Sequence, residues 1–241
     1  MKRSAPGPVA LLLALLSLPA SATTLWIKSD PHYTPAGFFD IHICHWPDRP
    51  NFYLMLFSTT RFTEVEGVEV FYPDGRPLAP IDMNRYRIVK RAGKPEKHVF
   101  ITNIALPANP PGGWYRATIR MKDGSTHHAR DRIEIHDMPM ATGLLPAPDS
   151  MNIPLPAQLS WQPVAGAKHY QVFIWDKWQG GKEIFKSKIL DEPRLILPPG
   201  LLQRGGSYKW RVHARDVNEH VELGDFNHGS LSPVVLFTVA D

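Results

Sequence analysis

SYKWRVHAR, residues 207–215, decides the fold of the second half of this chain. Apolar or aromatic side chains alternate with polar ones along this stretch, so one face carries Tyr208, Trp210, Val212 and Ala214. Strict alternation is the pattern of a half-buried β-strand. HYQVFIWD, residues 169–176, alternates in the same way. Two such stretches predict a sheet with one face in a hydrophobic core and the other turned outward.

Further short strands are expected around these two, separated by Gly and Pro turn signals. In the C-terminal half we expect strands at 158–161, 182–190, 194–197 and 231–239. In the N-terminal half we expect them at 38–46, 52–58, 67–72, 97–104, 113–121 and 126–136. Short strands at this spacing predict an all-β chain of two tandem β-sandwiches.

The C-terminal half resembles a fibronectin type III domain. Its first part carries Leu159-Ser160-Trp161 and then Val164 to Val172, and its second part runs from Leu197-Pro198-Pro199-Gly200 to Tyr208 and Ala214. The resemblance implies that Trp161 packs between the sheets and that the hydroxyl of Tyr208 bonds to nearby backbone, as in a tyrosine corner. It implies a fold and no activity. The N-terminal half resembles a bacterial immunoglobulin-like domain by pattern alone, and no functional residue is carried over from it.

The start of the chain has the three parts of a secretory signal peptide. Lys2 and Arg3 are followed by an apolar run at 9–18 and by the small residues Ala20-Ser21-Ala22. We expect cleavage after Ala22 and a periplasmic or secreted protein with no membrane span, because the apolar run is too short for a bilayer. The expected organisation is a signal peptide at 1–22, an Ig-like sandwich at 23–137, a Pro-rich linker at 138–150 and a fibronectin type III-like sandwich at 151–241.

The expected hairpin at 113–136 has a register that follows from its core faces. A three-residue loop at Lys122-Asp123-Gly124 pairs Ile119 with His127, which keeps the core sides of both strands in phase. The same register pairs Arg116 with Arg130. The outer face of the hairpin then carries many basic side chains, and Glu134 is its one acidic residue. The candidate partner-binding residues on this face are Arg116, Arg130 and Arg132.

A second candidate surface lies on the C-terminal sandwich. If Tyr170 and Tyr208 face inward, the outward side of their two strands is aromatic and basic, with Trp178 in a nearby loop. The residues expected there to bind a partner are Phe173, Trp175, Trp178, Lys209, Arg211 and His213. Such a face suits a protein partner or a stacked sugar. It is also compatible with packing against the first sandwich or with a solvated sheet.

Signals for catalysis are weak. The chain has no GxSxG, GxxxxGK[ST] or GxGxxG motif. The carboxylates Asp216, Glu219, Glu222 and Asp225 could bind calcium or form a glycosidase pair, but a solvated loop is the simpler reading. The chain holds one cysteine, Cys44, which is expected to be a small buried residue. We therefore expect no enzyme and no cofactor.

The chain has 11 histidines, which are common metal ligands. In a strand, His42 and Cys44 share a face while His45 points away, so HICHW at 42–46 does not make one metal site. A site assembled from separate strands stays open. The charge is nearly balanced, with 27 basic and 23 acidic residues, and gives no argument for nucleic acid.

These observations predict an exported, non-catalytic binding protein, a protein-interaction or assembly module with a partner in the cell envelope. The alternatives are a glycan-binding accessory module that stacks sugars on Trp175 and Trp178, and a metal-dependent envelope enzyme.

Overall fold

The computed structural model describes residues 30–217 and 226–241, and these residues form strands and turns with no helix among them. The all-β prediction is therefore confirmed. Residues Pro31–Asp241 form one compact unit. The expected signal peptide at 1–22 and the carboxylates of Glu219, Glu222 and Asp225 lie outside the described residues. Within those residues no helix is long and apolar enough to cross a membrane.

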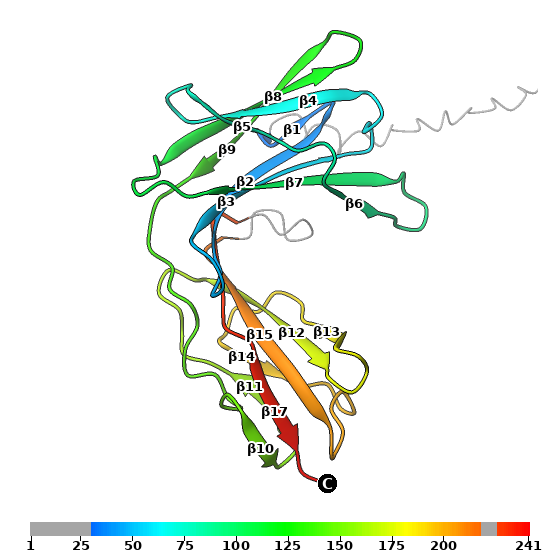
Figure 1. Cartoon of the computed structure of the whole chain (residues 1–241), viewed down its shortest axis with the longest axis vertical. Helices are drawn as coiled ribbons and strands as arrows, with labels where there is room; N and C mark the ends of the chain where they lie inside the picture. Colours follow the sequence, from blue (N-terminus) through cyan, green and yellow to red (C-terminus); the bar gives the residue numbers. More distant parts are fainter. Residues whose placement is uncertain (1–29, 218–225) are drawn as a thin grey trace, which may run out of the picture. The chain divides into compact units, whose positions relative to one another are not determined.

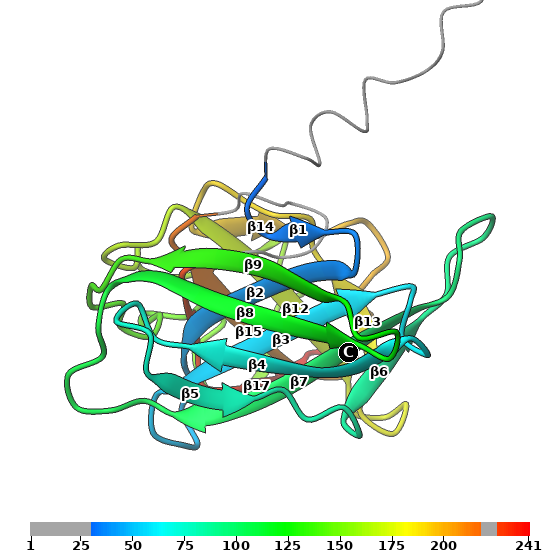
Figure 2. The ribbon, with the colours of Figure 1, turned by 90° about the horizontal axis from the view of Figure 1, so that it is seen from above.

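The first sandwich packs two sheets around one hydrophobic cluster (Figure 1). One sheet has the order β2-β3-β7-β6, with β1 paired to the start of β2. Its bounds are Tyr33–Thr34 (β1), Gly37–His45 (β2), Phe52–Thr59 (β3), Tyr86–Val89 (β6) and Lys97–Ala105 (β7). The other has the order β5-β4-β8-β9, seen side by side in Figure 2. Its bounds are Val65–Phe71 (β4), Pro77–Pro80 (β5), Gly113–Met121 (β8) and Thr126–Ile133 (β9).

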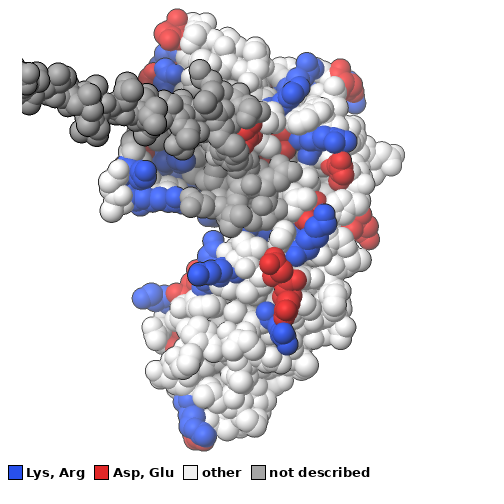
Figure 3. All heavy atoms as spheres, turned by 180° about the vertical axis from the view of Figure 1, so that it is seen from behind, with Lys and Arg blue, Asp and Glu red and all other residues white. Residues whose placement is uncertain are grey.

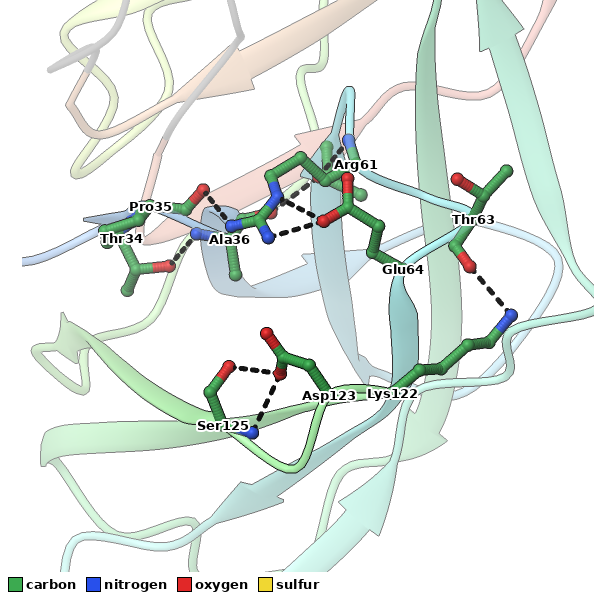
Figure 4. Close-up of polar contacts among 10 residues, drawn as sticks. Thr34, Pro35, Ala36, Arg61, Thr63, Glu64, Lys122, Asp123 and Ser125 are labelled. Atoms are coloured by element: carbon green, nitrogen blue, oxygen red, sulfur yellow. Dashed lines mark hydrogen bonds and ion pairs between the residues drawn. The ribbon is translucent and has the colours of Figure 1, made fainter.

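The β8–β9 hairpin has the predicted register. Ile119 pairs with His127 and Arg116 with Arg130. Gly124 has a φ of 84°, the left-handed conformation that the loop requires of a residue without a side chain. Figure 4 shows how the turn is fixed: Asp123 accepts hydrogen bonds from Ser125, and Lys122 donates to the carbonyl of Thr63 at 2.7 Å. The alternation predicts that Ile133 and Ile135 both face the core. For Ile135 this is wrong, because it is 44% exposed; β9 ends at Ile133, so the pairing stops before Ile135.

The second sandwich places a small sheet against a larger one. The small sheet pairs β11, Gln158–Ser160, with β14, Arg194–Ile196, and Leu145 bridges to Ser160. In the larger sheet β15 lies between β12 and β17, with β13 and β10 outside them. The bounds are Ser150–Ile153 (β10), His169–Asp176 (β12), Lys182–Lys186 (β13), Ser207–Arg215 (β15) and Val235–Val239 (β17).

The core of this sandwich contains the residues that the alternation and the family resemblance placed there. Trp161 is 5% exposed, and its ring lies 5.3 Å from Tyr170 and 6.2 Å from Trp210 between centroids. Tyr208 is buried, and its hydroxyl accepts a hydrogen bond from the backbone N–H of Gln203 at 2.8 Å. The predicted backbone bond of Tyr208 is therefore confirmed.

One strand connects the two sandwiches. The expected strand at 231–239 is two strands, because Ser232-Pro233 interrupts the alternation, and the first of them is β16, His228–Leu231. β16 pairs antiparallel with β15 and parallel with β2, where His228 lies opposite Ile43. The larger sheet of the second sandwich is therefore hydrogen-bonded to the β2-β3-β7-β6 sheet of the first.

The segment expected as a linker also takes part in packing. Met138, Ala141 and Leu144 are buried in the hydrophobic cluster of the second sandwich. The first cluster extends from Ala36 to Ile133. Burial of apolar side chains stabilises this segment where Pro-rich composition alone indicated a spacer. The domain boundaries themselves stay a prediction.

Candidate binding groove

The β2-β3-β7-β6 sheet is apolar on both of its faces. Along β3, Tyr53, Met55 and Phe57 point into the core. The side chains between them, Leu54 and Leu56, therefore point to the opposite face, since successive residues of a strand alternate. That outer face is hollowed, because both leucines line cavities there. A sheet with two apolar faces is typical of one that is covered on both sides.

The outer face holds a groove of about 590 Å³. Its floor is apolar and comes from three strands, with Phe38 on β2, Leu56 on β3, and Val99 and Ile101 on β7. Its rim is basic and comes from β6, the β6–β7 loop, β7 and β13, with the residues Arg87, Arg91, Lys94, Lys97 and Lys186. The described residues that line this groove include no Asp or Glu.

The acid of the β6–β7 loop is bonded to residues outside the groove lining. Glu96 lies in the β6–β7 loop, and its carboxylate is bonded to Lys90 at 2.9 Å and to His98 at 3.0 Å. Lys90 first, and His98 second, hold the pKa of Glu96 below its usual value. A concave surface lined by one sign of charge raises the local concentration of oppositely charged ligands. Figure 1 draws β6 at the right edge of the molecule. Figure 3 shows the molecule from behind, so this edge lies at its left, and basic side chains are visible there.

A second cavity of about 300 Å³ continues the groove toward the other sandwich. It shares Leu56, Arg87, Ile101 and Lys186 with the groove and adds Asp40, His42, Cys44, Gln171, His213 and Arg215. Arg215 is buried and donates to the Oε1 of Gln171 at 2.7 Å. Burial lowers the pKa of Arg215 to about 10, so its guanidinium stays charged at neutral pH.

The aromatic–basic face of the second sandwich, which we define as Phe173, Trp175, Lys209 and Arg211, is assembled as expected. The two rings stack with centroids 6.1 Å apart. Lys209 Nζ and the Arg211 guanidinium carbon each lie 5.5 Å from the centroid of the Trp175 ring. Lys186, a rim residue of the groove, lies 5.5 Å from the Phe173 ring, so the face and the groove meet at this side chain.

The same outward side of β12 and β15 is divided into two parts. At one end Gln171 and Arg215 are buried and face the first sandwich across the second cavity. At the other end Phe173, Trp175, Lys209 and Arg211 are partly exposed. His213 belongs to the covered end: burial lowers its pKa well below the usual value, with Arg215 as the next cause. Trp178 lies in the turn after β12 and is 74% exposed.

The arginines of β8 and β9 lie in the other sheet of the first sandwich and belong to neither cavity. Arg116 and Arg130 face each other across the pair, and Arg130 lies 4.6 Å above the Trp114 ring. Arg132 pairs with Glu134 at 3.1 Å. The expectation that Glu134 is the one acid on this face is wrong, since β4 lies beside β8 and brings Glu69 to within 2.9 Å of Arg120.

The histidines of the HICHW stretch lie as expected. His42 and Cys44 line the second cavity while His45 lines a different one. Cys44 is 1% exposed, and the prediction that it is buried is confirmed. Elsewhere among the described residues, one group of side chains could hold a metal: His136, Asp216 and His228.

The floor and rim of the groove were missed by sequence reasoning. A signal for the floor was present, because FYLMLFS at 52–58 is apolar without alternation, and such a run indicates a strand covered on both faces. The basic rim had no such signal. Arg87 and Lys186 are far apart in the sequence, and β6 itself was not expected.

Comparisons with known proteins give a fold likeness and no family. No family model matches the chain, and no curated protein matches it. Solved structures that resemble it include Dpr11 IG1 bound to DIP-gamma IG+IG2, 15% identical over 86% of this chain and 100% of that chain, with a TM-score of 0.26. Murine CEACAM1b is 10% identical over 83% of this chain and 99% of that chain, with a TM-score of 0.24.

A bacterial structure matches over a similar span. Dimeric latent PorU from Porphyromonas gingivalis is 12% identical over 86% of this chain and 20% of that chain, with a TM-score of 0.29. Immunoglobulin domains are thus among the structural neighbours, but likenesses at such TM-scores carry no argument about function. The all-β fold stands on the strand pairing itself.

Proposed function

We propose that this protein is an exported, non-catalytic binding module whose groove takes an extended segment of a protein partner that carries acidic and apolar side chains. The observation that carries the proposal is the groove itself. It joins an apolar floor of Phe38, Leu56, Val99 and Ile101 to a rim of five basic side chains, and no acid is among its described lining residues. A concave, mostly apolar site with a few polar groups around it is typical of a ligand-binding site.

The shape of the site favours an extended segment. The groove runs across three neighbouring strands beside β6, which ends the sheet in the described part of the chain. Tyr86 and Ile88 on β6 are 46% and 51% exposed. An extended peptide can pair its backbone with a sheet edge while alternate side chains enter neighbouring pockets. Acidic side chains at the intervening positions would meet the basic rim.

The location and the partner's compartment are part of the proposal. The basic, apolar and small-residue sequence at 1–22 supports export, and an envelope protein is then the natural partner class. We also infer that the second sandwich is of the fibronectin type III kind. The bond between Gln203 and the Tyr208 hydroxyl, at the start of β15, supports this inference.

Glycan binding is the second candidate, and Trp178 is the observation that favours it. This side chain is 74% exposed, and an open indole is a surface on which a sugar ring can stack. Trp175 suits that role less well, since Lys209 and Arg211 lie against its ring. A protein segment is therefore the better ligand for the aromatic–basic face.

The test compares fluorescent peptides of alternating Leu and Glu with peptides of alternating Leu and Lys, using fluorescence anisotropy on the mature protein. We expect the acidic peptides to bind and the basic ones not to. The double variant Arg87→Glu/Lys97→Glu should weaken acidic-peptide binding by about tenfold or more, because two attractive rim charges become repulsive. Arg116→Glu, on the opposite sheet, is the matched control and should bind as the wild type does.

Two results would contradict the proposal. One is equal binding of acidic and basic peptides, and the other is an equal loss of binding in the double variant and in Arg116→Glu. Soluble glucans form the second arm of the same titration. Saturable glucan binding that Trp178→Ala abolishes, with no peptide binding, would assign the protein to the glycan-binding class.

A further inference from the structure

Three side chains with metal-binding atoms meet near the strand that joins the two sandwiches. His136 follows β9, Asp216 follows β15, and His228 is the first residue of β16. One ligand atom of each residue lies within 4.8 Å of the ligand atoms of the other two. Imidazole and carboxylate are ligands that Zn²⁺ takes in proteins. The three residues are separate in the sequence, so only the fold brings them together.

The hydrogen bonds around the group leave one free ligand atom on each side chain. The carbonyl of Glu134 lies 3.2 Å from Nδ1 of His136 and 2.8 Å from Nε2 of His228. When these two nitrogens donate to it, Nε2 of His136 and Nδ1 of His228 keep their lone pairs. In a metal-binding histidine, the ring nitrogen that does not bind the metal usually donates its N–H to a carboxylate, a backbone carbonyl or water.

The carboxylate of Asp216 is oriented in a similar way. Its Oδ1 accepts hydrogen bonds from the backbone N–H groups of Val217, Asn227 and His228, at 2.8 to 3.1 Å. Its Oδ2 lies 3.5 Å from Nε2 of His136. One oxygen therefore holds backbone groups next to the end of β15 and at the start of β16, while the other faces the histidine. The side chain is buried, with 7% of its surface exposed, so its position is set by the fold.

We propose that His136, Asp216 and His228 bind one divalent transition-metal cation of the zinc class. Three protein ligands leave at least one coordination position for water. A cavity of about 60 Å³ beside the two histidines has room for such water. The cation would serve the structure, since it would tie the chain that leaves β9 to the end of β15 and the start of β16. The site is independent of the groove and of the proposed function.

The experiment uses the mature chain without a histidine tag, treated with EDTA, dialysed and titrated with ZnCl₂ by calorimetry. We expect saturable binding of one equivalent and a Zn²⁺-dependent rise of the melting temperature, because a ligand that binds the folded state stabilises it. Co²⁺ serves as a spectroscopic probe of nitrogen and oxygen ligation. His136→Gln should weaken binding by at least about tenfold and remove the rise in melting temperature.

The variants are chosen so that a folding defect does not imitate the result. His136 is exposed, so His136→Gln should fold without metal, which circular dichroism checks. His128→Gln on β9 is the matched control, since His128 is an exposed histidine outside the group. Absence of saturable Zn²⁺ binding by the wild type would overturn the proposal. Equal binding by the wild type and by His136→Gln would also overturn it, because the metal would then sit elsewhere.

Discussion

The two outer faces of the first sandwich are both rich in basic residues, yet they differ in what surrounds each charge. On the β8–β9 face, Arg120 and Arg132 have acidic partners and Arg130 lies over Trp114. On the β2-β3-β7-β6 face, a basic rim surrounds an apolar floor, and no acid is among the described lining residues. A count of basic residues on a strand therefore does not locate a site. Apolar surface next to charge of one sign does.

The largest effect on stability is expected from a substitution on the core side of β3, compared with one on its outer side. Met55 is completely buried in the core, whereas its neighbour Leu56 lines the groove. Met55→Ala should lower the free energy of unfolding by about 2–5 kcal/mol, as buried large-to-small changes do. Leu56→Ala should cost about 1 kcal/mol, because the leucine is already partly in water. Urea denaturation measures both. Equal costs would mean that the outer face is a second core layer.

The second-largest effect is a loss of partner binding, expected from a substitution on the aromatic–basic face. Trp175→Ala should weaken binding of a protein segment by about 2 kcal/mol, as loss of a central aromatic contact does, and should leave thermal stability nearly unchanged. Trp114→Ala is the matched control, since Trp114 is a partly exposed tryptophan beneath a guanidinium on the arginine face. If Trp175→Ala destabilises the protein like a core substitution and binding stays intact, this face is a packing surface.

A smaller effect is expected at the edge of the same face. Lys209 lies beside Trp175 and is partly exposed, so Lys209→Gln should slow association and reduce its salt dependence more than it speeds dissociation. Stopped-flow association rates at low and high salt measure this difference. Lys122→Gln, at the β8–β9 turn, should leave the rates as they are. A change confined to the dissociation rate would place Lys209 inside the interface.

The smallest effect should come from the paired arginines. Arg120→Ala removes an exposed ion pair with Glu69, and such pairs contribute little to stability. The variant should bind acidic peptides as the wild type does, with no resolvable change in melting temperature. If its binding falls as far as that of the Arg87→Glu/Lys97→Glu variant, the two faces do not differ in the way proposed.

Much of the fold could be predicted because local alternation decides it. The strands at 113–121, 169–176 and 207–215 have the expected bounds, since each has one buried and one outer face. β6 was missed because its four residues are almost all exposed and show no periodicity. The end of β9 was misplaced because Ile135 continues the pattern of Ile133 after pairing has stopped.

The candidate site could be predicted only in part, for a physical reason. Phe173 and Trp175 share a strand, so their common face follows from the period of two. The groove and the histidine group depend on long-range pairing, such as β16 with β2 and β3 with β7. No local pattern specifies a parallel pairing between residues 43–45 and 228–230, so nothing in the sequence placed His228 near His136.

The pairing of β16 with β2 has a consequence for handling the protein. β2 would otherwise be an edge strand; β1 pairs with its first residues, and β16 pairs with its last ones, Ile43 to His45. Open edges recruit strands from other molecules and lead to aggregation. A fragment that ends near Asp137 would lose β16 and expose the end of β2 beside the second cavity, which Cys44 lines. Expressed alone, the first sandwich should therefore self-associate, and separating the sandwiches would remove a safeguard against aggregation.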